Sequence, residues 1–284
     1  MQPLVCGGIR YHGAFVAVKV LKECDAPDTD IRAELLAMSR VGPHPCVVAL
    51  LGVSKHDGRP CIVSEFMPRG SLLDVLRGGN PQPSLVQCLE MARDAAAGVV
   101  HLHAAGVVHR DLAARNLLID AQYNVKVCDF GYARAIEGCG DLSALTKSNV
   151  GPVPWMAPES LRAHRYSTKS DVYMFGVTLL ELFTRGAVPW DGMTLLEAAH
   201  RVLAGETLEF MFPASAVPEV LQPLLRKCWL FAPADRPDMA AVHAELSAAA
   251  AAAGAASAGV AAAPAAGDGV GAVTRESLSA DYVR

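Results

Sequence analysis

The chain has 284 residues, of which 52% are hydrophobic and 19% are charged, enough apolar material for one large or two small domain cores. A net charge of -4 excludes the broad basic surface typical of proteins that bind nucleic acid or anionic membranes, so we expect protein and small-molecule partners. Its eight cysteines form no C-x-x-C pair, which indicates a reducing, intracellular and cytoplasmic location. We expect no membrane segment, because the alanine-rich stretch near the C-terminus is weakly apolar and interrupted by glycine, serine and proline.

The first sixty or so residues alternate short runs of strand-forming residues with one helical pattern. Residues 15–20 and 61–63 are rich in β-branched side chains, and residues 28–40 have helical spacing. A small sheet that carries one helix is therefore predicted. Residues 67–71, Met-Pro-Arg-Gly-Ser, indicate a turn, and we interpret them as a hinge to a second lobe.

From residue 84 onward the pattern is mostly helical. Helices are predicted over residues 85–103, 171–184, 195–204 and 217–229. After Leu246 the composition is dominated by Ala, Gly and Ser, whose side chains cannot bury enough surface to offset the loss of chain entropy on folding. We place the folded boundary near residue 250 and expect residues 251–284 to form an Ala/Gly-rich disordered tail, with at most a stub of helix at its start.

Five polar side chains occur in an order that has chemical meaning. Lys19 lies on a predicted strand and Glu34 on the following helix, Asp111 and Asn116 belong to His-Arg-Asp-Leu-Ala-Ala-Arg-Asn at 109–116, and Asp129 begins Asp-Phe-Gly. Phosphoryl transfer from ATP requires a lysine on the phosphates, carboxylate and amide ligands for Mg²⁺, and a carboxylate that orients the attacking hydroxyl. Each motif alone is weak, but their order and spacing together point to this chemistry.

These motifs resemble those of eukaryotic protein kinases, in the tyrosine-kinase-like and tyrosine kinase group. The resemblance continues through residues 155–159, 170–176 and 235–237, and covers residues 3 to about 250. It implies an α+β, bilobal protein kinase fold, with a small antiparallel β-sheet lobe carrying one helix (residues 1–67) and a larger, mainly helical lobe (68–250). It also implies an ATP-dependent protein kinase that uses ATP and Mg²⁺ (or Mn²⁺) and acts on a protein substrate.

The resemblance assigns roles to the polar residues position by position. Lys19, paired with Glu34, is expected to hold the α- and β-phosphates, and Asp111 is expected to be the catalytic base. Asn116 and Asp129 are expected to bind Mg²⁺, and Arg115 and Asn116 are expected to belong to the catalytic set with Lys19 and Asp111.

The resemblance also implies an adenine pocket and one structural ion pair. The residues expected to contact or border adenine are Val5 and Ala17 above it, Leu118 below it, Ser64 at the gatekeeper position, and the backbone of Glu65 and Met67. Glu159 is expected to pair with Arg236 inside the larger lobe.

Three positions are similar to tyrosine kinases. Ala113 and Pro152 stand where Ser/Thr kinases usually carry lysine and threonine, and Arg115 follows Asp111 by four residues, as in many receptor-type tyrosine kinases. This pattern favours a tyrosine hydroxyl as the acceptor.

Other positions favour a Ser/Thr or dual specificity. Residues 129–159 contain a single tyrosine, Tyr132, which is poorly placed as an acceptor, and Pro154 replaces the basic residue usual in tyrosine kinases. The candidate phosphorylation sites of this activation segment are Ser143, Thr146 and Ser148. We therefore lean slightly to Ser/Thr or dual specificity, with a protein tyrosine kinase as the alternative.

The glycine-rich loop of the resembled family has no counterpart here. Counting back from Lys19, its third glycine would fall on Pro3 and the first two before Met1, so the first strand of the small lobe is expected to be missing. Two explanations stand: the chain is a fragment of a longer kinase, or it is a weakly active kinase or pseudokinase that acts as a scaffold. We favour the fragment, because every catalytic side chain outside the loop is present.

Overall fold

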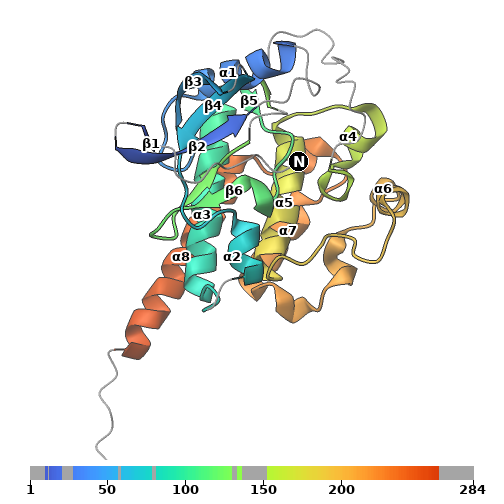
Figure 1. The fold of residues 1–284 in the computed structure, drawn as a ribbon. Coiled ribbons are helices and arrows are strands. Elements are labelled where there is room, and N and C mark those ends of the chain that lie inside the picture. The colour runs from blue at the N-terminus through green and yellow to red at the C-terminus, as the bar shows by residue number, and fades with distance from the viewer. Residues whose placement is uncertain are drawn as a thin grey trace, which may run out of the picture.

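The structure is a computed structural model that describes residues 10–11, 13–20, 28–56, 59–78, 81–129, 133–135 and 152–261. Within these residues, a small four-stranded sheet and one helix lie against a larger, mainly helical part. Figure 1 shows the sheet and this helix at one end of the molecule, with the helices of the larger part beneath them. This arrangement confirms the predicted α+β, bilobal architecture.

The small sheet is antiparallel and has the strand order β1-β2-β4-β3. Its strands are β1 (Arg10–Tyr11), β2 (Ala14–Val20), β3 (Leu50–His56) and β4 (Arg59–Glu65), and its helix is α1 (Asp28–Val41). On β2, Val16 and Val18 are buried on one face, so Ala17 and Lys19 lie on the other, because successive strand side chains alternate. Ala17 is opposite Ser64 in β4, so Lys19 and Ser64 project from the same face of the sheet.

Several helices of the larger part begin at polar caps. Ser84 and Gln87 form a capping box at the start of α3, and Thr194 and Glu197 form one at α6. The helices are α2 (Leu72–Gly78), α3 (Leu85–Ala104), α4 (Pro158–Ala163), α5 (Thr168–Phe183), α6 (Leu195–Leu203), α7 (Gln222–Cys228) and α8 (Met239–Ala261). Short strands pair as β5 (Val107–Val108) with β8 (Arg134–Ala135), and as β6 (Leu117–Ile119) with β7 (Val125–Val127). Two 3-10 turns border the candidate site, η1 (Ala114–Asn116) and η3 (Val153–Trp155).

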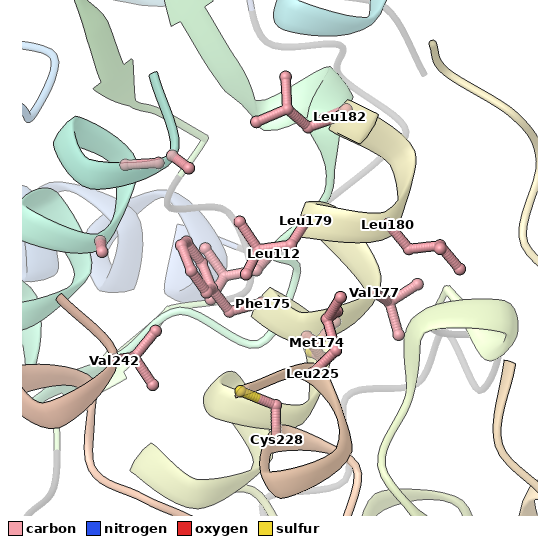
Figure 2. Close-up of a cluster of buried hydrophobic side chains, with 14 of the residues drawn as sticks. Leu112, Met174, Phe175, Val177, Leu179, Leu180, Leu182, Leu225, Cys228 and Val242 are labelled. Atoms are coloured by element: carbon pink, nitrogen blue, oxygen red, sulfur yellow. The ribbon is translucent and has the colours of Figure 1, made fainter. Parts of the chain in front are cut away.

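Helix α5 is the centre of the larger part, because every residue from Ser170 to Leu182 is buried. Figure 2 shows apolar side chains leaving this helix in several directions, with Leu112 from the loop 109–116 beside Phe175. A helix that is buried all round places any polar side chain it carries in a water-poor environment. The two acids of α5, Asp171 and Glu181, therefore need hydrogen-bond partners from the segments packed around them.

The predicted helices at 28–40, 85–103, 171–184 and 195–204 are confirmed within a few residues as α1, α3, α5 and α6. The single helix predicted over 217–229 is wrong at its start. A 3-10 turn, η6 (Glu219–Leu221), precedes α7, which begins at Gln222. Pro223 has no backbone N–H, and such a residue fits the first turn of a helix but not its interior.

Helix α8 continues to Ala261, past the boundary expected near residue 250. Leu246 and Ala250 are buried in the main core, and Ala253 packs partly against it. In Figure 1 the last turns of α8 project away from the body. Residues 251–261 are thus helical rather than disordered, whereas residues 262–284 lie outside the described residues. The division into a domain at 1–250 and a tail stays a prediction.

The sequence analysis did not anticipate that one helix has the length and composition to cross a membrane. Among the described residues this is the part of α8 from Met239 to Ser257. Its residues Met239, Val242 and Leu246 are buried against the rest of the larger part, as in a helix that contributes to a domain core.

The predicted pair of Glu159 and Arg236 is confirmed. The fully buried guanidinium of Arg236 donates from Nη1 and Nη2 to the two carboxylate oxygens of Glu159, at 2.7 and 2.8 Å. It also donates from Nε to the Leu230 carbonyl at 2.7 Å and from Nη1 to the Lys169 carbonyl at 2.9 Å. This bidentate pair, with its remaining donors satisfied, ties α4 to the start of α5 and to the segment that precedes α8.

We expect Gly98→Ala to destabilise the protein, because α3 passes very close to the segment after α1. A Cβ at Gly98 would overlap the Cys46 carbonyl oxygen and lie 2.7 Å from Cγ2 of Val127. The free energy of unfolding, measured by denaturant titration, should fall by about 1–3 kcal/mol. Gly254→Ala in α8 is the matched control, because its Cβ meets nothing within 4 Å, and it should raise stability by up to ~1 kcal/mol. Equal stability of Gly98→Ala and the wild type would contradict this packing.

Candidate active site

The loop 109–116 is held in place by the carboxylate of Asp171, a fully buried residue of α5. Asp171 accepts the backbone N–H groups of His109 at 2.8 Å and Arg110 at 2.9 Å, and the Nε2 atom of His103 lies 2.9 Å from its Oδ2. Arg110 has a φ of 68°, in the left-handed region that non-glycine residues rarely adopt. The two hydrogen bonds from this turn to Asp171 hold the unusual backbone conformation in place.

Asp111, the acid of this loop, is buried, with 6% of its surface exposed. Its Oδ2 accepts from Asn116 Nδ2 at 2.8 Å, and its carbonyl accepts from the same nitrogen at 2.6 Å. Its Oδ1 forms a short ion pair with Nη2 of Arg115. Burial raises the pKa of the Asp111 carboxyl above its ordinary value, and the charge of Arg115 opposes that rise. The carboxylate of Asp111 is therefore held by Asn116 and Arg115, and its pKa depends on the opposing effects of burial and the charge of Arg115.

Lys19 and Asp129 bring the two lobes together. The Nζ atom of Lys19 lies 3.1 Å from Oδ1 of Asp129, and each side chain is about one third exposed. Asp129 follows β7 with a φ of 62°, and the residue before it, Cys128, donates its N–H to the Asn116 carbonyl at 3.0 Å. Asp129 is therefore anchored beside the loop that carries Asp111, while its carboxylate stays accessible to a ligand.

Among the residues predicted to border adenine, Ala17 and Ser64 lie on one face of the small sheet, and Leu118 lies on β6 of the larger part. Between the lobes, the side chain of Glu65 accepts from Lys126 Nζ at 2.7 Å and from the Ala49 N–H at 2.7 Å. These bonds tie the end of β4 to β7, so the segment that joins the lobes is fixed at its start.

A second buried acid of α5 joins two segments of the site. Glu181 Oε2 accepts the backbone N–H of Ala114 at 2.9 Å and the indole Nε1–H of Trp155 at 2.8 Å. The guanidinium carbon of Arg115 lies 4.7 Å from the centre of the Trp155 ring. Burial raises the pKa of the Glu181 carboxyl above its ordinary value, and the two hydrogen bonds oppose that rise.

The sequence analysis assigned no role to Asp171 or Glu181. The signal that points to each of them is an acid within the mostly apolar run of residues 170–182, since a buried carboxylate needs hydrogen-bond donors. The partners themselves lie more than sixty residues away along the chain and come from the fold.

The oxygen atoms required for a magnesium ion are present at the predicted positions. Asp129 offers a carboxylate, and because Nδ2 of Asn116 donates to Asp111, the amide oxygen remains as the acceptor of that side chain. Among the residues that the structure describes, no group of three or more His, Cys, Asp or Glu side chains is arranged to hold a metal. A divalent ion at Asp129 and Asn116 would thus require further ligands from a bound phosphate or water.

Several predicted residues fall where the structure offers no description. These are Val5, the side chain of Glu34, and the candidate phosphorylation sites Ser143, Thr146 and Ser148. Lys19 lies beside Asp129, and the pairing of Lys19 with Glu34 stays a prediction.

The sequence model of the family described as protein tyrosine and serine/threonine kinase matches residues 6–246. The chain is 39% identical over 229 residues to the tyrosine-protein kinase ABL2 of Homo sapiens, covering 80% of this chain and 19% of that protein. It is 36% identical over 236 residues to the tyrosine-protein kinase Fer of Rattus norvegicus (82% and 28%). It is 35% identical over 245 residues to the tyrosine-protein kinase transforming protein Fps of an avian sarcoma virus (85% and 45%).

The chain therefore spans less than half the length of each of these relatives. All three are tyrosine-protein kinases by name, so the comparisons do not support the lean to Ser/Thr or dual specificity and favour the tyrosine alternative.

We predict that Arg115→Gln raises the pKa of Asp111 further, because the substitution removes the positive charge in contact with its carboxylate. The carboxyl ¹³C chemical shift of Asp111, followed through a pH titration, measures this change. Arg93→Gln is the matched control, because Arg93 pairs with Asp94 on α3, apart from the loop. An unchanged Asp111 titration in Arg115→Gln would contradict the electrostatic role of Arg115.

Proposed function

We propose that this chain, which belongs to the protein tyrosine and serine/threonine kinase family, transfers the γ-phosphoryl group of ATP to a tyrosine hydroxyl of a protein substrate. The contact of Arg115 with Asp111 carries the proposal. Ala113 stands where a lysine is usual in Ser/Thr kinases, so the cation beside the catalytic carboxylate comes from four residues after it. The similarity to named tyrosine-protein kinases supports the same acceptor.

In this proposal Asp111 orients the acceptor hydroxyl and accepts its proton. The carboxylate is held by Asn116 and by Arg115, so it does not need to reorganise when the substrate binds. Burial raises the pKa of Asp111 and the charge of Arg115 opposes that rise, so Arg115 favours the ionised form that a proton acceptor requires. Mg²⁺ or Mn²⁺ bound with ATP would supply charge neutralisation on the phosphates, with Asp129 and Asn116 as its protein ligands.

The remaining residues of the proposed site bind ATP. Lys19, now beside Asp129, is the cation for the α- and β-phosphates, and Ala17 and Leu118 would cover the two faces of adenine. The Glu65 N–H already donates to the Ala49 carbonyl at 3.1 Å, and the Met67 carbonyl accepts from Gly70 at 3.2 Å. The adenine contacts therefore fall to the Glu65 carbonyl and the Met67 N–H.

Three further assignments belong to this proposal. Val5 would complete the upper face of adenine, and Glu34 would pair with Lys19. The enzyme would be intracellular and cytoplasmic. Phosphorylation of its activation segment, at Ser143, Thr146 or Ser148, would regulate it. The presence of Lys19 and Asp111 together with both metal-ligand positions favours catalysis over a scaffold role.

The test is a pair of peptides that differ only in a tyrosine or serine at the acceptor position, assayed with radiolabelled ATP and Mg²⁺. We expect phosphate on the tyrosine peptide, and we expect Asp111→Asn to lower kcat by about 10²–10⁴-fold, because the proton acceptor is lost. Glu245→Gln, which alters only an exposed pair with Lys227, should leave kcat unchanged. Faster transfer to the serine peptide, or full activity of Asp111→Asn, would contradict the proposal.

A further inference from the structure

The second acid of α5, Glu181, is placed between two segments that a peptide substrate would contact. It is 3% exposed, and a single oxygen, Oε2, accepts from both Ala114 in η1 and Trp155 in η3. The first segment belongs to the loop that carries Asp111, and the second leads into α4. One carboxylate oxygen thus joins the proposed catalytic loop to the last part of the activation segment, residues 129–159.

Stability alone does not account for an acid at this position. Burial raises the pKa of the Glu181 carboxyl, and its two hydrogen bonds and the charges of Arg115 and Arg77 oppose that rise. A buried charge of this kind is weak evidence for stability, because apolar side chains of similar volume often stabilise a core as well or better. Most side chains of α5 near it are apolar, so a role in positioning explains the acid better than packing does.

The contacts of Trp155 continue toward the proposed proton acceptor. Its indole N–H is held by Glu181, and its ring lies under the guanidinium of Arg115. Nη2 of the same guanidinium contacts Oδ1 of Asp111. A change at Glu181 would therefore move the ring on which Arg115 rests, and with it the cation beside the acceptor site.

We propose that Glu181 is a positioning residue that holds Trp155 and thereby orients Arg115 at the site of the acceptor hydroxyl, which sets the preference for tyrosine over serine. This inference rests on the proposed tyrosine kinase function. Lys19 and Ala17, which are proposed to contact the phosphates and adenine, lie on β2 of the small sheet, apart from η1 and η3. Loss of the Glu181 bond should consequently affect the peptide and spare ATP.

The experiment measures kcat and the KM for ATP and for both matched peptides in Glu181→Gln, Trp155→Phe and the double variant of the 284-residue chain. Trp155→Phe keeps a ring beneath Arg115 but removes the indole donor. Each single variant should lower kcat/KM for the tyrosine peptide by roughly tenfold or more, since a hydrogen bond to a charged group is lost. The tyrosine-to-serine preference should fall with it, and the KM for ATP should stay within about twofold of the wild type.

The double variant separates positioning from general damage. If Glu181 acts through Trp155, the double variant should lose no more than the worse single variant, because both remove the same bond. Glu206→Gln, in an exposed pair with Arg201, is the matched control and should behave as the wild type. Circular dichroism and thermal unfolding check that each variant folds, and if Glu181→Gln does not, Trp155→Phe alone must show the peptide-specific loss.

The outcomes distinguish this inference from the proposed function. An active wild type whose variants lose activity additively, raise the KM for ATP equally, or keep the full tyrosine preference overturns the role of Glu181 alone. A wild-type chain that phosphorylates neither peptide overturns the proposed function and the inference together.

Discussion

The hydrogen bonds between the buried carboxylate of Asp171 and the loop 109–116 are the interaction on which the rest of the site depends. The acid lies on α5, the most enclosed helix of the larger lobe, and accepts two successive backbone N–H groups, from His109 and Arg110. Those two bonds fix a turn with a left-handed residue at Arg110, directly before Asp111. The rigid apolar core thus positions a polar loop that could not be held by apolar packing alone.

The same helix supports the site at a second point, through Glu181. The two acids lie near opposite ends of the buried run of α5, and they hold opposite ends of the loop: Asp171 binds its first residues, and Glu181 binds Ala114 near its end. Between these two anchors, Asp111 is held by Asn116 and Arg115. Both buried charges have an energetic cost, and the structure meets that cost with backbone donors that also define the site.

The sequence predicts the residues that would carry out the chemistry better than it predicts the buried residues that hold them in place. Asp111, Asn116 and Asp129 are identified by short motifs, and the structure brings them into one neighbourhood. The pair of Glu159 and Arg236 is also predicted by the motifs that contain them, and it forms. The roles of Asp171 and Glu181 were not predicted, because each depends on contacts across more than sixty residues that local patterns do not contain.

The errors in the secondary structure have identifiable causes. The composition after Leu246 predicts at most a stub of helix, because Ala, Gly and Ser bury little surface. The helix is longer than that, because alanine has the highest intrinsic helix propensity and a helix already anchored in the core extends through it to Ala261. The start of α7 was misplaced because apolar periodicity continues through Pro223, although proline limits where the helix begins. The lean to Ser/Thr or dual specificity rests on Tyr132 and Pro154, whereas the relatives are tyrosine-protein kinases by name and favour the tyrosine alternative.

The account is tested most directly by hydrogen exchange in Asp171→Asn, which keeps the shape of the side chain and removes its charge and one acceptor. If this carboxylate holds the loop, the His109 and Arg110 amides should exchange markedly faster than in the wild type. Amides in the middle of α3 should keep their protection. Unchanged protection of the two loop amides would show that the loop is held by other interactions, and would contradict the central role given to α5.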